Sequence, residues 1–299
     1  MAESDGEYPQ SLMVGSMQIA YCFILLPEAL LSKMIPKIFL FQLLLTFLTG
    51  SCWIYFTVLA GLRFGSKTGG FIGGLPSTAL LSFFFIGFTQ SPKIASSVTT
   101  VFPVAIAISG LFLVVFAMLS RKGFMLALLS AVGFWFFLSS IIVFFSFGNF
   151  ATNLAIYAIV MLFAYFMLEK YLLIKSVSSD KTGHAEKHLA VRSLFGGMIV
   201  TLTVFIAKTG GPVLGGLFAA FPAMFISTLT ISYKTHGIEF SRAMTKPLMV
   251  TGMITIAVFA VALRYLFLSA GLYAGILLSI CISAVSAWLT YRFILPRLK

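Results

Sequence analysis

Two lysine- and glycine-rich segments hold the residues best suited to chemistry. The first reads KTGGFIGGLP at 67–76 and the second KTGGPVLGGLFAAFP at 208–222, so one lies in each half of the chain. Four glycines followed by a proline oppose a continuous helix, because glycine costs about 1 kcal/mol and proline about 3 kcal/mol in a helix interior. In a membrane, such breaks persist where the freed backbone groups line a cavity or are buried in protein.

A helix end at such a break presents unpaired N–H groups and the positive end of the helix dipole, which attract anions. A neighbouring lysine adds a full positive charge. We therefore expect two substrate-binding turns, formed by Lys67, Thr68, Gly69, Gly70, Gly73, Gly74 and Pro76, and by Lys208, Thr209, Gly210, Gly211, Gly215, Gly216 and Pro222. In the alternative interpretation, the glycines only permit close helix packing and the lysines extend to the membrane interface.

Two acidic residues lie in or beside apolar runs. Glu28 stands in LLPEALL and Glu169 in FMLEKYL, and each precedes the lysine of its own half by the same interval. An acid within a membrane span is a candidate proton or cation site, so both are possible coupling acids. Both also lie near predicted span ends, so placement at the interface is the alternative.

Other chemistry has no support in the sequence. The three cysteines lie inside apolar runs without the spacing of metal ligands. The G-x-S-x-G, P-loop and H-E-x-x-H motifs are absent. We therefore expect no metal, no other cofactor, no catalytic residue and no enzymatic activity.

The elements that position these residues must be helices in a lipid bilayer. The chain is 60% hydrophobic and only 9% charged, with a mean hydropathy of +1.06. Apolar runs of about 18 or more residues recur, which is the length that crosses a bilayer. The sequence predicts an all-α integral membrane protein with about ten transmembrane helices, at 11–31, 38–62, 71–90, 95–119, 124–147, 153–174, 192–208, 213–233, 247–268 and 272–295.

The charge distribution predicts the orientation. With ten spans, fifteen lysines and arginines fall on the side of the N-terminus and five on the other side. This bias predicts a multi-pass protein of the cell membrane (plasma or inner) with both termini in the cytoplasm. Because the basic residues cluster at span ends, the net charge of +12 does not indicate nucleic-acid binding. The acidic N-terminal tail at 1–10 lacks the basic region of a signal peptide, so we expect the first span to be retained.

The repeated segment divides the chain into two halves. We expect a first five-helix repeat at 11–147 and a second at 148–299, with a polar loop at 175–190 inside the second. An odd number of spans in each repeat gives the halves opposite orientations in the membrane. Inverted repeats of this kind are a recurring plan of secondary transporters.

The second half, from about 192 to 295, resembles the GlpM-like family of small four-helix bacterial inner-membrane proteins. The resemblance rests on AKTGGPVLGGLFAAFPAMFIST at 207–228 and KTHGIEFSRAM at 234–244, with Lys208, Gly216 and Pro222 at matching spacing. The first half fits less well, because the stretch from Lys67 to Pro76 is shorter than that from Lys208 to Pro222. The resemblance implies a four-helix unit that was duplicated and fused, with spans one and six added, and it implies no defined activity.

These features favour a transporter or exporter of a small anionic solute, bound at the interface of the two halves. An ion channel that uses the glycine breaks as a gate is one alternative. A lipid-phosphate-handling accessory protein of envelope biosynthesis is another. The expected partners are membrane lipids, the anionic solute or ion, and possibly further copies of the chain in a homo-oligomer.

Overall fold

A computed structural model describes residues 37–63, 76–145, 148–174 and 189–294. All regular elements in these ranges are helices. The predicted span at 11–31 lies outside them, as do Glu28, the stretch from Lys67 to Gly74 and most of the polar loop.

The first half of the described chain contains helices α3 to α9. Their bounds are α3 Lys37–Arg63, α5 Ser77–Thr89, α6 Pro92–Val98, α7 Phe102–Leu119, the 3₁₀-helix η1 Ser120–Lys122, α8 Phe124–Phe145, α9 Phe150–Phe166 and the π-helix η2 Met167–Tyr171. The remaining elements are α10 Leu189–Ala219, α11 Ala223–His236, α12 Ile238–Ala243, α13 Thr245–Pro247, the π-helix η4 Leu248–Gly252, α14 Met253–Ser269, α15 Gly271–Leu289 and the π-helix η5 Thr290–Ile294.

Seven helical segments among the described residues are long and apolar enough to cross a membrane. They include α3, α7, α8, α9 and α15, together with two longer segments that join neighbouring helices, Leu189–His236 and Ile238–Ser269. The predicted class, a helical membrane protein, agrees with this finding. Helix α5 is apolar but shorter.

Two predicted spans are not continuous helices. The span expected at 95–119 is divided between α6 and α7, because the chain leaves the helix between Thr99 and Val101. The side chain of Ser91 caps the start of α6 by accepting a hydrogen bond from the Ile94 N–H. The span expected at 213–233 is interrupted between Ala219 and Ala223.

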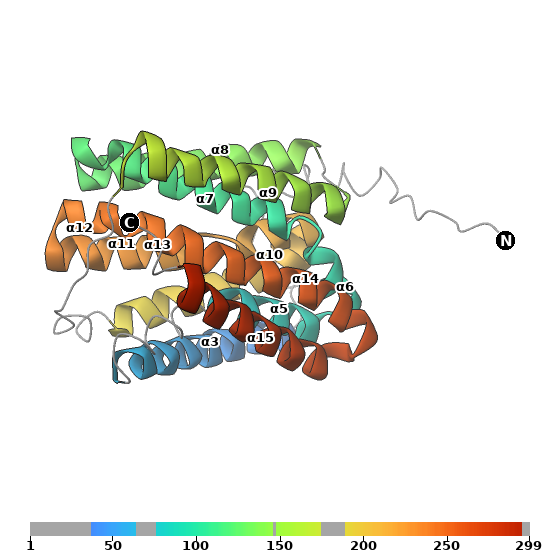
Figure 1. Ribbon diagram of the computed structural model, residues 1–299. Coiled ribbons are helices and arrows are strands. Elements are labelled where there is room, and N and C mark those ends of the chain that lie inside the picture. The colour runs from blue at the N-terminus through green and yellow to red at the C-terminus, as the bar shows by residue number, and fades with distance from the viewer. Residues whose placement is uncertain (1–36, 64–75, 146–147, 175–188, 295–299) are drawn as a thin grey trace.

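The helices lie roughly along one direction (Figure 1). Helices α7, α8 and α9 form one side of the molecule, and α3, α5 and α15 form the other. Helix α10 packs against α3, α5 and α7, and α14 packs against α7 and α15, so these two helices join the sides. Helices α11 and α12 lie towards the left end in Figure 1 and α6 towards the right end.

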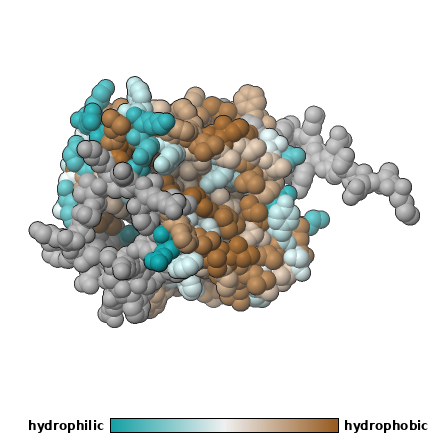
Figure 2. Space-filling view, in the orientation of Figure 1, coloured by the Kyte–Doolittle hydropathy of each residue, from teal (hydrophilic) through white to brown (hydrophobic). Residues whose placement is uncertain are grey.

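The outer surface is apolar in its middle. Hydrophobic side chains cover the centre of the face in Figure 2, and hydrophilic side chains gather mostly at the left end, with fewer at the right. Large apolar residues such as Phe41, Phe137 and Leu277 are more than 60% exposed. An apolar belt between polar ends suits helices that cross a lipid bilayer.

A candidate anion site at two helix N-termini

Two bends interrupt the chain between the start of α10 and the end of α11. Gly211 adopts φ +82° and ψ −177°, a conformation that favours glycine, and Pro212 begins the next helical stretch. This stretch ends at Ala219, and α11 begins at Ala223 with Pro222 as its N-cap. The chain therefore enters α11 through a short non-helical turn.

Helix α5 begins with nearly the same local geometry. Its N-cap, Pro76, has φ −78° and ψ 56°, against φ −77° and ψ 40° for Pro222. Neither cap supplies a side-chain hydrogen bond. The first helical bonds run from the N–H of Leu80 to Pro76 (2.8 Å) and from the N–H of Ile226 to Pro222 (2.9 Å). The N–H of Ala223 donates to the carbonyl of Phe221 at 2.8 Å. The other N–H groups that precede these bonds in each first turn have no intrahelical acceptor.

The two helix N-termini meet at one cavity of about 90 Å³. Pro76 and Pro222 both line it. From this cavity, α5 runs towards the end of the molecule where α6 lies, and α11 runs towards the opposite end, where α12 lies (Figure 1). The positive ends of two helix dipoles therefore converge on one space from opposite directions.

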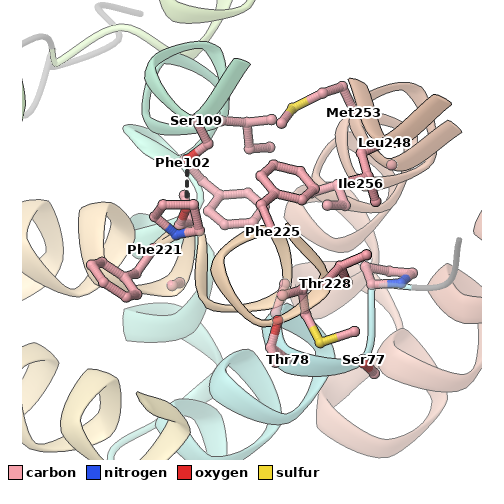
Figure 3. A pocket seen from close by; sticks show the side chains of 18 of the residues that line it. Ser77, Thr78, Phe102, Ser109, Phe221, Phe225, Thr228, Leu248, Met253 and Ile256 are labelled. Carbon is pink, nitrogen blue, oxygen red and sulfur yellow. Dashed lines mark hydrogen bonds between the residues drawn. The ribbon is translucent and has the colours of Figure 1, made fainter. Parts of the chain in front are cut away.

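The lining combines hydroxyl groups with aromatic and aliphatic side chains. The hydroxyls belong to Ser77, Thr78, Ser109 and Thr228. In Figure 3, Phe102 and Phe225 occupy the centre of the view, with Thr78 and Thr228 to one side of them and Ser109 to the other. Such a space offers hydrogen-bond donors at a few points and apolar contact elsewhere.

Ser109 ties the interruption to the neighbouring helices. Its hydroxyl donates to the carbonyl oxygen of Ala220 at 2.7 Å, which is the dashed bond in Figure 3. It also accepts a hydrogen bond from the indole Nε1 of Trp135 at 3.1 Å. Ser109 and Trp135 are both buried. This chain of bonds holds the non-helical turn against α7 and α8.

Arg192 brings a positive charge to the cavity from the first turn of α10. Its Nη2 lies 3.7 Å from the Sδ of Met224, which is a weak contact. Its Nε is buried and has no hydrogen-bond partner among the described residues. The described lining contains no aspartate or glutamate. Within the described chain, the guanidinium therefore lacks a counter-charge at the cavity.

The predicted residues of the second lysine–glycine segment lie apart from this lining, except for Pro222. Lys208 is exposed, with its Nζ 4.2 Å from the centroid of the Phe39 ring. The hydroxyl of Thr209 donates to the carbonyl of Phe205 at 2.9 Å, within its own helix. Neither side chain contacts the cavity.

The glycines of this segment allow close packing and a bend in the backbone. A Cβ added at Gly215 would lie 2.6 Å from the Cβ of Ala207, and one at Gly216 would lie 2.6 Å from the carbonyl oxygen of Val98. Gly211 makes the bend, and a Cβ on Gly210 would meet Leu214 at 2.6 Å. For Gly215 and Gly216, the structure supports the interpretation of close packing.

Glu169 belongs to a separate charged cluster. Its carboxylate forms an ion pair with Lys246, whose side chain is 1% exposed, whereas that of Glu169 is 31% exposed. Nearby, Arg242 donates from Nε to the carbonyl of Ala117 and from Nη2 to the carbonyl of Leu172, both at 3.2 Å. Glu169 lies within the π-helix η2, and the π-helix η4 begins shortly after Lys246. Such π-bulges are frequent at functional sites.

Helix α9 joins this cluster to a polar group near the opposite end of the helix. There, the side-chain amide of Asn153 donates to the carbonyl of Thr100 at 2.7 Å. The Nη1 of Arg264 donates to the Thr100 hydroxyl at 2.9 Å, and its guanidinium lies 4.6 Å from the centroid of the Phe150 ring. Arg264 thus anchors α14 to the break between α6 and α7.

The sequence did not predict that Arg192 lines a cavity or that the Lys246 side chain is buried. Both residues were counted among the charges at the ends of membrane spans. One signal for Arg192 is its place in the apolar run LAVRSLFGGMIV. Lys246 stands in a polar stretch and gives no comparable signal. Among the described residues, no group of three His, Cys, Asp or Glu side chains gathers as a metal site would require.

Residues 189–295 match the model of a family described as "Protein of unknown function (DUF3147)". This match covers α10 to η5, the part of the chain that carries the sequence resemblance, and it does not bear out the GlpM-like name. A search of curated proteins and a search of solved structures each returned no match.

Proposed function

We propose that the protein is a membrane carrier for a small anionic solute, which binds in the cavity between Pro76 and Pro222. One observation carries the proposal. Two helix N-termini that run to opposite ends of the molecule meet at a cavity that also receives Arg192.

Electrostatics favours an anion in this cavity. Arg192 is partly buried, and its Nε is buried without a partner among the described residues. A cation withdrawn from water without a counter-charge is costly, and a bound anion removes that cost. The N–H groups and dipoles of α5 and α11 act in the same direction. The hydroxyls of Thr78 and Thr228 offer further donors.

The positions of the helices support a repeat of the part of each half that follows its first span, namely α3 to α8 and α10 to α15. The interval along the chain from the cap Pro76 to the cap Pro222 equals the interval from Pro92 to Ile238, the first residues of α6 and α12. Gly123 and Gly271, both with positive φ, stand at the starts of α8 and α15. The order long helix, capped helix, short helix, long helix, long helix thus recurs.

Helix α9 supports the same division. Its N-terminal part contacts Thr100 through Asn153, and its C-terminal extension contacts Lys246 through Glu169. Thr100 and Lys246 are separated by the same interval as the two proline caps. With ten spans, the two units are inverted and both termini are cytoplasmic. Alternating access then follows if each half can adopt the conformation of the other.

Thermal unfolding of the purified protein tests for the anion site. Chloride, inorganic phosphate and acetate are compared, because a ligand that binds only the folded state raises Tm. At least one of them should stabilise the wild type. The Arg192→Gln variant should lose this ligand-induced shift. Arg292→Gln, which removes an exposed arginine of η5, should keep it.

A ligand-induced shift of equal size in Arg192→Gln would overturn the proposed site. The absence of any shift in the wild type, with these anions and with short-chain acids, would overturn the proposed function.

A further inference from the structure

We infer that the solute is a small organic monoanion, a carboxylate or sulfonate with a short apolar tail. This inference rests on the proposed function and adds the chemical class of the substrate. Three features of the cavity carry it, namely the single positive charge in its described lining, its apolar wall and its volume.

The charge of the lining sets the charge of the ligand. Arg192 is the one charged side chain in the described lining. A monoanion neutralises it, whereas a dianion brings a second negative charge into a space with low dielectric and no second cation among the described lining residues. The planar guanidinium also matches the two oxygens of a carboxylate. Phosphate and dicarboxylates are therefore poorer ligands.

The apolar part of the lining is unsuited to a bare inorganic anion. Phe102, Ile106, Met253 and Ile256 line the same cavity as Arg192. Chloride or phosphate would leave these side chains against water or empty space. An alkyl tail covers them, and each methylene that is buried improves affinity by about fourfold.

The volume limits the length of that tail. A cavity of roughly 150 Å³ accommodates benzene, with six carbons. The present cavity of about 90 Å³ therefore holds about four non-hydrogen atoms. Acetate has this size, and propionate is larger by one atom. Longer acids must displace the lining, so affinity should fall again with chain length.

Isothermal titration of the full-length protein in detergent tests the class directly. The probes are formate, acetate, propionate, butyrate and hexanoate, with chloride, inorganic phosphate and succinate for comparison. Affinity should peak at acetate or propionate and be at least tenfold weaker for succinate. Tighter binding of chloride, phosphate or succinate that depends on Arg192 would overturn the inference and leave the proposed function intact. Monocarboxylate binding that survives in Arg192→Gln would overturn both.

An enlarged cavity provides the second arm of the test. Ile256→Ala removes part of the apolar wall, so the optimum should move to an acid longer by one or two carbons. Ile280→Ala is the matched control, because Ile280 is also partly buried against the core but lies outside the cavity. An unchanged optimum in a folded Ile256→Ala protein would contradict the assignment of the tail to this wall.

Discussion

The unpaired guanidinium of Arg192 favours binding of an anion but lowers the stability of the protein when no anion is bound. Its Nε is buried without a hydrogen-bond partner among the described residues. An unsatisfied buried polar group of this kind costs about 1–3 kcal/mol. In the absence of ligand, we predict that Arg192→Met stabilises the protein by about this amount.

Thermal and denaturant unfolding in detergent can measure this change, with the exposed Arg292→Met as control. A loss of stability in Arg192→Met would instead assign Arg192 a structural role.

Removing the charge of Glu169 should destabilise the protein, because Glu169 forms an ion pair with Lys246. Replacing Glu169 by Gln removes the counter-charge that it offers to the ammonium of Lys246, a side chain that is 1% exposed. Breaking a buried pair typically costs about 3–5 kcal/mol. Glu239→Gln is the control, because the Glu239 side chain is 76% exposed and lies 3.9 Å from Arg242. An exposed pair contributes at most about 1 kcal/mol.

Unfolding in denaturant should therefore separate Glu169→Gln clearly from Glu239→Gln. Equal stability of the two variants would show that the Lys246 ammonium does not depend on Glu169.

The sequence identified individual residues better than their partners. Glu169 was recognised because an acid inside an apolar run is rare, but its partner Lys246 comes much later in the chain, beyond the whole of α10 and α11. Such a pairing is decided by the approach of η2 to α12 and α13, where Glu169 meets Lys246 and Arg242 donates to the carbonyl of Leu172, and no local pattern reports it. The role of Glu169 as a coupling acid stays a prediction. Arg192 was overlooked for the same reason, since its place at the cavity depends on the packing of α10 against α5 and α11.

At the scale of the elements, close contact between α10 and α6 explains Gly216 better than ligand binding does. Gly216 packs so closely that an added Cβ would lie 2.6 Å from a backbone oxygen of Val98. We predict that Gly216→Ala destabilises the protein by about 1–3 kcal/mol, because the backbone at the end of α6 must move.

Gly133→Ala is the matched control, since a Cβ at Gly133 in α8 meets nothing within 4 Å. Helix propensity alone should make that change neutral or stabilising by up to about 1 kcal/mol. The Tm of the two variants distinguishes the cases. Similar Tm values would show that the contact between Gly216 and Val98 is not tight.

Hydropathy predicted the long helices well, as for α8, which covers Phe124–Phe145 against an expected 124–147. The position of the break was predicted less well. We expected the binding turn at Lys208, but α10 continues to Ala219, because Gly211 absorbs the bend and Pro212 starts a new helical stretch. The non-helical turn comes at Ala220–Pro222, the last three residues of the segment at 208–222, and Pro222 is the one predicted binding residue that takes part in it. Composition indicates that a break exists, and tertiary contacts such as that of Ser109 decide where it lies.

At the scale of the whole molecule, the proposed carrier depends on two halves of the chain that meet at one cavity. The repeated sequence suggested both halves, and the matching positions of α5 with α11 and of α6 with α12 support them. The sequence already assigned Pro76 and Pro222 to a site between the halves, and both prolines line one cavity, whereas Lys208 lies outside it. A carrier of this design exchanges solute across the membrane by alternating the side to which the cavity opens.

Counterflow in proteoliposomes tests this central claim most directly. Vesicles are loaded with unlabelled methanesulfonate or, in parallel, inorganic phosphate, and diluted into a trace of the same labelled anion. Methanesulfonate is chosen because it is close to acetate in size, stays charged and does not cross lipid as a neutral acid. We predict transient accumulation of label above its external concentration with wild-type protein and with Arg292→Gln, and at least a tenfold loss with Arg192→Gln. Equilibration without accumulation, or equal accumulation in Arg192→Gln, would contradict a carrier that binds its anion at Arg192.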